Sequence, residues 1–318
     1  MATQQPAAAS AAAQPGAVAG AVRPVSGDDE ATPRLKKRRG PLWFQILWVN
    51  GKTRAGIIML GVFTFVAVFA PWIAPYDPKS QEFDPSLPVS AAHWLGTTSQ
   101  GQDIFSQLVY GARTSMIVGL LGGLLATLIA LIVGMTAGYL QGWVDEGLSF
   151  FINLALVIPV LPLMIVLAAY SPVRGIGLIV FIIAITGWAW GARVKRSQII
   201  TLRTRDYVTA AKFAGDGTMR IIFREIMPNM TSLVVAGFMG AATAAVGAEA
   251  GLAFLGLGDP STVSWGTMLY FAENGSAMLT GQWIWLFTPG ICLALLITSL
   301  TLINFGVDAL SNPHLREG

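Results

Sequence analysis

The stretch DYVTAAKFAGDGTMRIIFREIMPN, residues 206–229, is the longest polar interval between apolar runs of membrane-spanning length. Small apolar residues recur in it at the spacing of one helix face, at Tyr207, Ala210, Ala211 and Ala214. A stripe of this kind lets the backbone approach a partner groove closely, because large side chains would hold it away. A connector helix that packs on its own chain has the same spacing. The pattern alone leaves both interpretations open.

The residues around this stripe are typical of helix ends. Asp206 is suited to cap the start of the helix, because its carboxylate can accept from exposed backbone amides. Gly215 and Gly217 are expected to end the helix, and Thr218 to cap a second one. Pro228 suits the first turn of the next apolar span. The interval therefore predicts a helix–glycine–helix segment.

The whole chain is too apolar for a soluble domain, since 54% of its 318 residues are hydrophobic and 12% are charged. The one cysteine, Cys292, excludes an internal disulfide framework and a cysteine-based metal site. Two histidines, His93 and His314, are too few and too far apart for a metal cluster. A net charge of +3 does not mark a nucleic-acid binder. We expect an all-α polytopic membrane protein without a metal.

Six apolar runs reach spanning length, which is about 20 residues. They lie at residues 55–74, 114–138, 149–170, 176–192, 231–254 and 284–306, and the fourth is the shortest. Pro159 and Pro162 in the third run, and Pro289 in the sixth, are expected to kink their helices. The sequence thus predicts a transmembrane bundle of six helices, with a polar loop at residues 193–230.

The ends of the chain differ from this core. Residues 1–40 are rich in Ala, Pro, Gln and Gly and end in the basic run 36–39, which predicts a disordered tail. Its basic end is suited to lie against anionic lipid, and a solvated tail is the alternative for the residues before Arg34. Residues 41–54 carry two tryptophans and predict a short interfacial helix. Residues 51–53 read Gly-Lys-Thr, but a phosphate loop needs a glycine where Ile46 stands. Residues 55–113 then form the first span and an outer segment, residues 114–312 the core, and residues 313–318 a tail.

The basic residues give the expected orientation. With the N-terminus inside, 17 of the 20 Lys and Arg residues fall on the cytoplasmic side, and only Lys79, Arg113 and Arg174 fall outside. The positive-inside rule therefore predicts that both termini and residues 193–230 are cytoplasmic.

The segment at residues 206–229 resembles the cytoplasmic coupling loop of ABC importer permeases. The match is carried by Ala210, Ala211 and Gly215, followed by Pro228 and Asn229. The resemblance implies that this helix docks on an ATP-hydrolysing subunit through Asp206, Tyr207, Ala210, Ala211, Lys212 and Gly215. Thr209 and Glu225 depart from the family pattern, which has a Glu and an Ile at these places.

Two outer stretches resemble the peptide and nickel branch of that family. The first carries the matching residues His93, Leu95, Gly96, Thr97, Gly101, Asp103, Gly111, Ala112 and Arg113. The second carries Leu255, Gly256, Leu257, Gly258, Pro260, Ser264, Trp265 and Gly266. Thr98, Gln102 and Gln107 replace charged residues, so the ion pairs of those residues are absent.

This resemblance implies a "C"-type half of a heterodimeric pathway for dipeptides or oligopeptides in a bacterial inner membrane. Its implied partners are a homologous permease subunit, two ATP-binding subunits that hold the ATP, and an extracytoplasmic substrate-binding protein. That protein would dock near Asp103, Ser264, Trp265 and Gly266. The plainer interpretation is that the first stretch is a folded cap and that Trp265 anchors its loop at the membrane surface.

Small residues occur at every fourth position of two spans and predict close helix packing. They are Gly122, Ala126, Ala130, Gly134 and Gly138 in the second span, and Ala236, Gly240, Ala244 and Ala248 in the fifth. We expect these two spans at the centre of the bundle, as static contacts or as movable seams around a pathway.

Glu249 is the only acidic residue well inside a predicted span. A charge at mid-bilayer costs roughly 2.5–3.5 kcal/mol on insertion scales, so this side chain should face protein or water. It either accepts hydrogen bonds from the nearby glycine-rich turn or lines the pathway.

The chain contains no catalytic motif, which argues against an intramembrane enzyme. A secondary transporter or channel is the alternative function. Such a protein usually carries several buried ionisable groups or two corresponding broken helices. One glutamate and no visible internal repeat favour the ATP-driven importer.

Overall fold

The computed structural model describes the backbone of residues 50–311 and the side chains of residues 50–307. The predicted tails at residues 1–40 and 313–318 lie outside these residues, as does most of the expected interfacial helix. The four residues 51–54 of that helix instead begin the first long helix, and the Asn50 side chain caps it by accepting from the Lys52 amide at 3.0 Å.

The described residues form helices and connecting loops, without a strand. The long helices are α2 (Gly51–Val68), α4 (Ile104–Leu140), α5 (Gly142–Val157), α6 (Val160–Tyr170), α7 (Ile176–Leu202), α10 (Thr231–Phe254) and α12 (Trp283–Ser311). The shorter elements are α3 (Ala70–Ile73), α8 (Asp206–Phe213), α9 (Thr218–Arg220), the π-helix η1 (Ile221–Ile226), the 3-10 helix η2 (Met227–Met230) and α11 (Trp265–Asn274). Five helical stretches are long and apolar enough to cross a membrane, and α5 with α6 makes a sixth if the pair is one span. The predicted all-α transmembrane bundle is confirmed.

The third predicted span is broken. Helices α5 and α6 meet at an angle of 85°, so residues 149–170 are not one straight helix. Ile158 and Pro159 between them have extended backbone angles. Proline disfavours the helical conformation of the residue before it and cannot donate a helical hydrogen bond. The kink predicted at Pro159 is therefore confirmed. Pro289 lies inside the continuous helix α12, and the kink expected there stays a prediction.

Two other predicted spans were too short. Helix α4 begins at residue 104 and not at 114, because Asp103 caps it by accepting from the Ser106 amide at 2.8 Å. Helix α7 runs to residue 202 and not to 192; in this extension Lys195 is buried and Arg196 binds Asp145 of α5. The fifth predicted span, residues 231–254, matches α10 residue for residue.

Helix α4 lies at the centre of the bundle. Its glycines allow the backbones of the neighbouring helices to approach it closely. A methyl group on Gly134 would lie 2.5 Å from the Ala192 carbonyl oxygen of α7. One on Gly123 would lie 2.6 Å from the Ala242 backbone of α10. In lipid, such close packing holds helices together, since apolar burial gives little driving force there. The predicted central position of the second span is confirmed.

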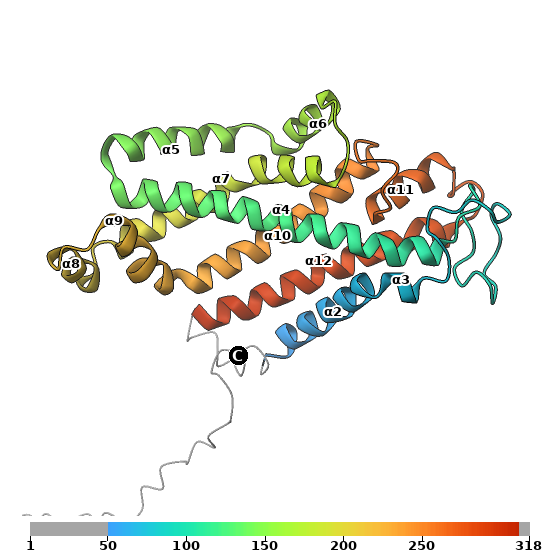
Figure 1. The fold of residues 1–318 in the computed structure, drawn as a ribbon, viewed down its shortest axis with the longest axis horizontal. Helices are drawn as coiled ribbons and strands as arrows, with labels where there is room; N and C mark the ends of the chain where they lie inside the picture. Colours follow the sequence, from blue (N-terminus) through green and yellow to red (C-terminus); the bar gives the residue numbers. More distant parts are fainter. Residues whose placement is uncertain (1–49, 312–318) are drawn as a thin grey trace, which may run out of the picture. The chain divides into compact units, whose positions relative to one another are not determined.

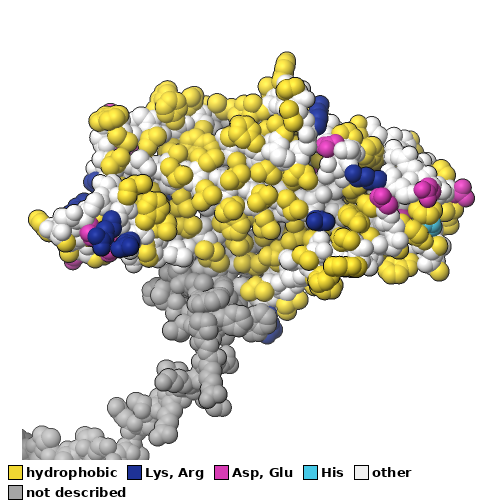
Figure 2. Space-filling view, in the orientation of Figure 1, with side chains coloured by type: hydrophobic (Ala, Val, Ile, Leu, Met, Phe, Trp, Pro, Cys, Tyr) yellow, Lys and Arg dark blue, Asp and Glu magenta, His cyan; other side chains and the backbone are white. Residues whose placement is uncertain are grey.

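The helices alternate in direction between two ends of the bundle. Figure 1 shows α8 and α9 at one end, and α11 with the loop of residues 74–103 at the other. Helix α2 runs toward this loop, α4 returns, and α5, α7, α10 and α12 continue the alternation. Figure 2 shows hydrophobic side chains over the middle of the visible face and basic side chains gathered over α8 and α9.

Candidate coupling segment and membrane pathway

Helix α8 lies where the sequence predicts it, but its start differs in detail. Arg205 is the N-cap and makes no side-chain capping bond, and Asp206 is the first helical residue. The predicted Asp206 cap is therefore wrong, although its negative charge in the first turn still favours the helix dipole. The predicted Thr218 cap is wrong in the same way, because Gly217 is the N-cap of α9. Pro228 lies in η2, one short element before α10.

The end of α8 forms a Schellman motif. The Gly215 amide donates to the Lys212 carbonyl at 3.0 Å, and the Asp216 amide donates to the Ala211 carbonyl at 3.1 Å. Gly215 has a φ of +84°, a conformation that glycine adopts without a steric penalty. The helix end predicted at Gly215 is confirmed.

One side of α8 packs on its own chain. Val208 is fully buried in a cluster with Met135 of α4, Ile199 of α7 and the isoleucines of η1. Tyr207 and Ala211 pack partly buried against the same cluster. Part of the predicted stripe therefore faces inward and mounts α8 on the ends of α4 and α7.

The other side of α8 is open. Ala210 and Ala214 are exposed, and the Phe213 side chain is 88% exposed. Met219, just beyond the glycine turn, is 67% exposed. The exposed face of α8 therefore includes Ala210 and Phe213, whereas Ala211 is turned toward its own chain. Phe213 was not among the predicted coupling residues, although a large apolar residue one helical turn after Ala210 is visible in the sequence.

Charged side chains tie this end of the molecule together. The Lys212 ammonium lies 5.3 Å from the ring centroid of Tyr139 on α4, so this predicted coupling residue contacts its own chain. Arg196 of α7 binds Asp145 of α5 through two hydrogen bonds of 2.5 and 2.7 Å. Arg220 pairs with Asp216 at 3.1 Å across the turn. The first contact joins α8 to α4, the second joins α5 to α7, and the third lies within the turn itself.

Helix α10 presents a hollowed face of small residues. One cavity of about 370 Å³ lies between α4, α7, α10 and α12, and a second of about 310 Å³ lies between α4, α6, α7 and α10. The two cavities share Ala126, Gly187, Ala241 and Ala244 as lining residues. Gly240 and Ala244 of the predicted stripe are exposed here, so this stripe faces open space where the stripe of α4 is packed. This face is the structure's candidate for one wall of a pathway.

Glu249 is buried beside this wall, with 4% of its surface exposed. Its carboxylate accepts a hydrogen bond of 3.1 Å from the Ser115 hydroxyl of α4, and Ser115 in turn accepts one of 3.4 Å from the Trp265 amide. The partner differs from the glycine-rich turn that we expected. The contact joins α4, α10 and α11 and favours a structural role for Glu249.

Trp265 is a core residue. It is 1% exposed, and its indole N–H donates to the Leu108 carbonyl of α4 at 2.9 Å. The expected anchoring of Trp265 at the membrane surface is therefore wrong. Ser264 begins α11 by a capping box with Thr267, and Gly266 is buried against Ala250 and Ala253 of α10. This helix was not predicted.

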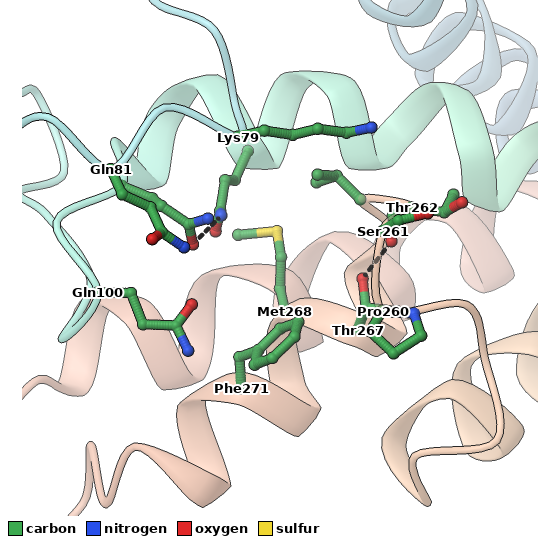
Figure 3. A pocket seen from close by; sticks show the side chains of 12 residues that line it. Lys79, Gln81, Gln100, Pro260, Ser261, Thr262, Thr267, Met268 and Phe271 are labelled. Atoms are coloured by element: carbon green, nitrogen blue, oxygen red, sulfur yellow. Dashed lines mark hydrogen bonds between the residues drawn. The ribbon is translucent and has the colours of Figure 1, made fainter.

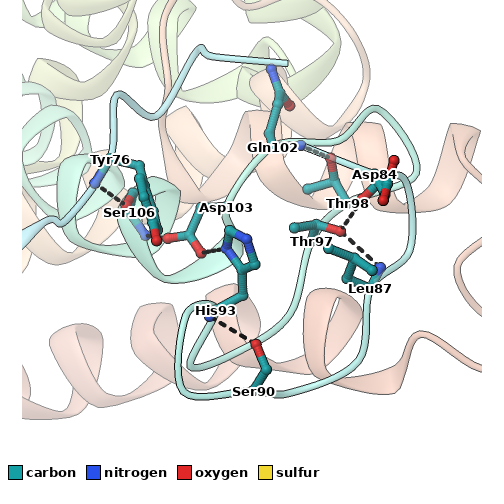
Figure 4. A network of polar contacts seen from close by, with 10 residues as sticks. All are labelled: Tyr76, Asp84, Leu87, Ser90, His93, Thr97, Thr98, Gln102, Asp103 and Ser106. Carbon is teal, nitrogen blue, oxygen red and sulfur yellow. Dashed lines mark hydrogen bonds and ion pairs between the residues drawn. The ribbon is translucent and has the colours of Figure 1, made fainter. Parts of the chain in front are cut away.

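The loop of residues 74–103 is folded around a buried histidine–aspartate pair, shown in Figure 4. His93 Nδ1 and Asp103 Oδ1 are 2.9 Å apart, and the Thr97 hydroxyl donates to the Asp84 carbonyl at 2.7 Å. Gln107 donates to Gln102 at 2.7 Å, a neutral contact where the family has charges. Asp103 is 1% exposed, so like Ser264, Trp265 and Gly266 it holds the loops at this end of the bundle in place and presents no surface to a partner.

A cavity of about 220 Å³ separates this loop from α11. Glutamines of the loop, Gln81 and Gln100, lie opposite Met268 and Phe271 of α11, as Figure 3 shows. No cluster of three His, Cys, Asp or Glu side chains that could hold a metal occurs within residues 50–307.

Comparison with known proteins identifies the family. Residues 130–317 match the family model of the binding-protein-dependent transport system inner membrane component. Residues 53–88 match the N-terminal TM domain of oligopeptide transport permease C.

Named relatives cover most of the chain. The dipeptide transport system permease protein DppC of Escherichia coli K12 is 37% identical over 276 residues, which are 82% of this chain and 89% of the relative. DppC of Bacillus subtilis is 33% identical over 271 residues, 84% of this chain and 83% of the relative. The oligopeptide transport system permease protein OppC of Mycobacterium tuberculosis H37Rv is 34% identical over 277 residues, 84% and 94% of the two chains.

A solved structure of the MetNI methionine ABC transporter, in inward-facing conformations, shares the fold. Its TM-score is 0.52 at 18% sequence identity, and the match covers 64% of this chain and 94% of that chain. The family model spans more than half of the sequence, and the identities exceed 30% over most of it. The chain is therefore a multi-pass membrane protein that belongs to the family of binding-protein-dependent transport system inner membrane components.

Proposed function

We propose that the chain is one half of the translocation pathway of an ATP-driven importer of dipeptides or oligopeptides. The names of its relatives support this substrate class, because permeases of dipeptide and oligopeptide systems match over more than 80% of the chain. A homologous permease would form the second half, against the open face of α10. Two ATP-binding subunits and an extracytoplasmic substrate-binding protein would complete the system.

The observation that carries the proposal is the mounting of α8. Val208 buries this helix in a cluster that contains Met135 of α4 and Ile199 of α7, while Ala210 and Phe213 face outward. Because packed interfaces move as units, force applied to the outward face passes to the ends of two membrane helices. This is the geometry that a subunit without ATPase motifs needs if ATP hydrolysis elsewhere is to move it.

The proposed orientation follows from charge and topology together. Eight Lys and Arg residues lie between Arg193 and Arg224, and α8 and α9 share one end of the bundle. The positive-inside rule places this end in the cytoplasm of a bacterial cell and the folded loop of residues 74–103 on the outer side. The substrate-binding protein would then dock on exposed residues around that loop, such as Trp94, which is 58% exposed.

Reconstitution tests the proposal. The chain should co-purify in mild detergent with a second permease and two ATP-binding subunits, and the complex should import a labelled dipeptide in proteoliposomes that contain ATP. A substitution that blocks ATP hydrolysis in the partner subunits should stop uptake, while collapse of the ion gradients should leave it unchanged. Uptake that follows an ion gradient and needs no ATPase would overturn the proposal in favour of a secondary transporter.

A further inference from the structure

Lys195 of α7 is a buried cation without a counter-charge. Its residue surface is 2% exposed, and within residues 50–307 its ammonium has no hydrogen bond or ion pair. Its neighbours differ, because Arg196 binds Asp145 at 2.5 Å and Arg193 donates to Asn153 at 3.4 Å. Transfer of an unpaired ammonium out of water is costly. Exposure to water therefore does not explain why a lysine occupies this position.

Glycines on two helices make room for this ammonium. A methyl group on Gly237 of α10 would lie 3.1 Å from the Lys195 Nζ, and one on Gly191 of α7 would lie 3.3 Å from it. Gly134 of α4 accommodates the base of the same side chain, since a methyl group there would lie 3.1 Å from the Lys195 Cβ. Three helices thus leave space for a lysine whose tip lies between α7 and α10.

The ammonium faces the cavity of about 370 Å³ described above, together with two other polar side chains. These are Thr127 of α4 and Asn304 of α12. The Thr127 Oγ1 and the Asn304 Oδ1 are buried, and neither has a hydrogen-bond partner among the described residues. The remaining lining is mostly small and apolar. The cavity therefore gathers a cation, a hydroxyl and an amide oxygen that have no partner within residues 50–307.

Two of these groups, the Lys195 ammonium and the Thr127 hydroxyl, match the chemistry of a carboxylate. A carboxylate has two oxygens that accept several hydrogen bonds, and an ammonium and a hydroxyl are both donors. The volume of the cavity falls within the range of about 300–1,000 Å³ that is usual for small-molecule sites. It shares Ala126, Gly187, Ala241 and Ala244 with the neighbouring apolar cavity, which lies nearer the outer end of α10. An anion that enters along this face would reach Lys195 on the side of α8.

We infer that Lys195, with Thr127, binds the carboxylate of a solute as it passes the α8 half of the pathway. This inference rests on the proposed function, because it makes the open face of α10 the wall along which the solute moves. Every peptide with a free C-terminus carries such a carboxylate, whatever its side chains. The site would therefore recognise a feature that all substrates share, and selection among their side chains would take place at another site.

Binding is tested directly on the purified complex without its binding protein. In a Cys292→Ser background, Ala244→Cys places a thiol in the shared lining of both cavities, and its rate of modification by a neutral maleimide is measured. Millimolar glycylglycine should slow the modification severalfold, and glycylglycinamide, which lacks the carboxylate, should not. Adding Lys195→Met should abolish the difference. Adding Arg193→Met, which removes a neighbouring exposed charge outside the cavity, should preserve it. Equal protection by the two compounds, or protection that survives Lys195→Met, would overturn the inference.

Stability and uptake separate this role from a structural one. The Lys195→Met complex should be at least as heat-stable as the unaltered complex, because it no longer buries an unpaired charge. Its maximal uptake of a dipeptide should fall roughly tenfold, the effect of losing one charge-assisted contact. Loss of assembly in Lys195→Met would instead indicate an acidic partner on another subunit and refute the solute site. If the unaltered complex shows no ATP-dependent uptake, the proposed function fails, and the labelling experiment still decides whether the carboxylate binds.

Discussion

The Ser115 hydroxyl on α4 donates to the buried carboxylate of Glu249 on α10 at 3.1 Å, across 134 positions of sequence. This contact is a buried polar link between α4 and α10, beside the open face of α10. Ser115→Ala should destabilise the complex by about 1–3 kcal/mol, because it leaves a buried acceptor without this donor. The shift is measured as the melting temperature of the detergent-purified complex.

Glu249→Gln is the matched variant. Its amide oxygen can still accept from Ser115, so assembly should be retained and the melting temperature should change less than in Ser115→Ala. If the melting temperature of the Ser115→Ala complex is unchanged, the hydrogen bond contributes nothing to the stability of the complex.

At the closely packed glycines of α4, a Gly→Ala substitution should lower the stability of the protein, although the same substitution usually stabilises a helix. In an open helix position the change stabilises by roughly 0.5–1 kcal/mol. At Gly134 the new methyl group would lie 2.5 Å from the Ala192 carbonyl and must push α7 away. Gly134→Ala should therefore destabilise by about 1–3 kcal/mol.

Gly61→Ala on α2 is the control, since no atom lies within 4 Å of its added methyl group. Thermal denaturation of the two variants in the same detergent compares them. Equal melting temperatures would contradict the close contact of α4 with α7.

The pair of Asp145 and Arg196 fixes α5 to α7 near the coupling segment. A double-mutant cycle with Asp145→Asn and Arg196→Gln should give a coupling energy of about 1 kcal/mol, because the side chains are partly exposed and doubly hydrogen-bonded. Unfolding in mixed micelles at two salt concentrations provides the measurement, and the coupling should weaken at high salt. Strictly additive effects would mean that the two side chains act independently.

Asp259 makes the loop before α11 sensitive to acid. The Ser261 hydroxyl donates to its carboxylate at 2.7 Å and lowers its pKa below the ordinary value of 3.8. A carboxyl with a lowered folded pKa contributes stability that is present above the unfolded pKa and is lost as the pH falls through the folded one. Protection of the amides of residues 259–262 from hydrogen exchange should therefore decrease below about pH 4, relative to Asp259→Asn. A loop whose protection relative to that variant stays constant down to pH 2 would contradict this role of Asp259.

The sequence predicted the elements whose signals are local. Helix α10 begins and ends where its apolar run does, and Gly215 ends α8 because a left-handed residue is needed there. The break at Pro159 has the same local origin. These features depend on backbone chemistry that each residue carries by itself.

Other features depend on contacts between distant residues. Helix α4 starts early because polar residues such as Gln107 are buried by the loop of residues 74–103, which no local pattern shows. Trp265 has the composition of a membrane-surface residue but finds a carbonyl acceptor inside the fold. The predicted fourth span ended at residue 192, before the basic residues Arg193, Lys195 and Arg196, whereas three glycines from separate helices make room for Lys195 inside the fold.

Which of the predicted coupling residues on α8 point outward also depends on contacts between distant residues. Helical spacing put Ala211 and Ala210 in one stripe, and only the position of the Val208 cluster decides which of them points away from the chain. A tryptophan at Ala211 would disturb that cluster, so a docking test must use Ala210.

The central claim is that the outward face of α8 contacts an ATP-binding subunit. In a Cys292→Ser background, Ala210→Cys is labelled with a photoactivatable maleimide in the assembled complex, and Ala55→Cys, exposed at the start of α2, is the control. We expect illumination to link position 210 to the ATP-binding subunit, with a yield that changes between the ATP-bound and nucleotide-free complexes, and position 55 to give no such product. Absence of the cross-link at position 210, or labelling of position 210 by a membrane-impermeant reagent from outside the cell, would contradict the account.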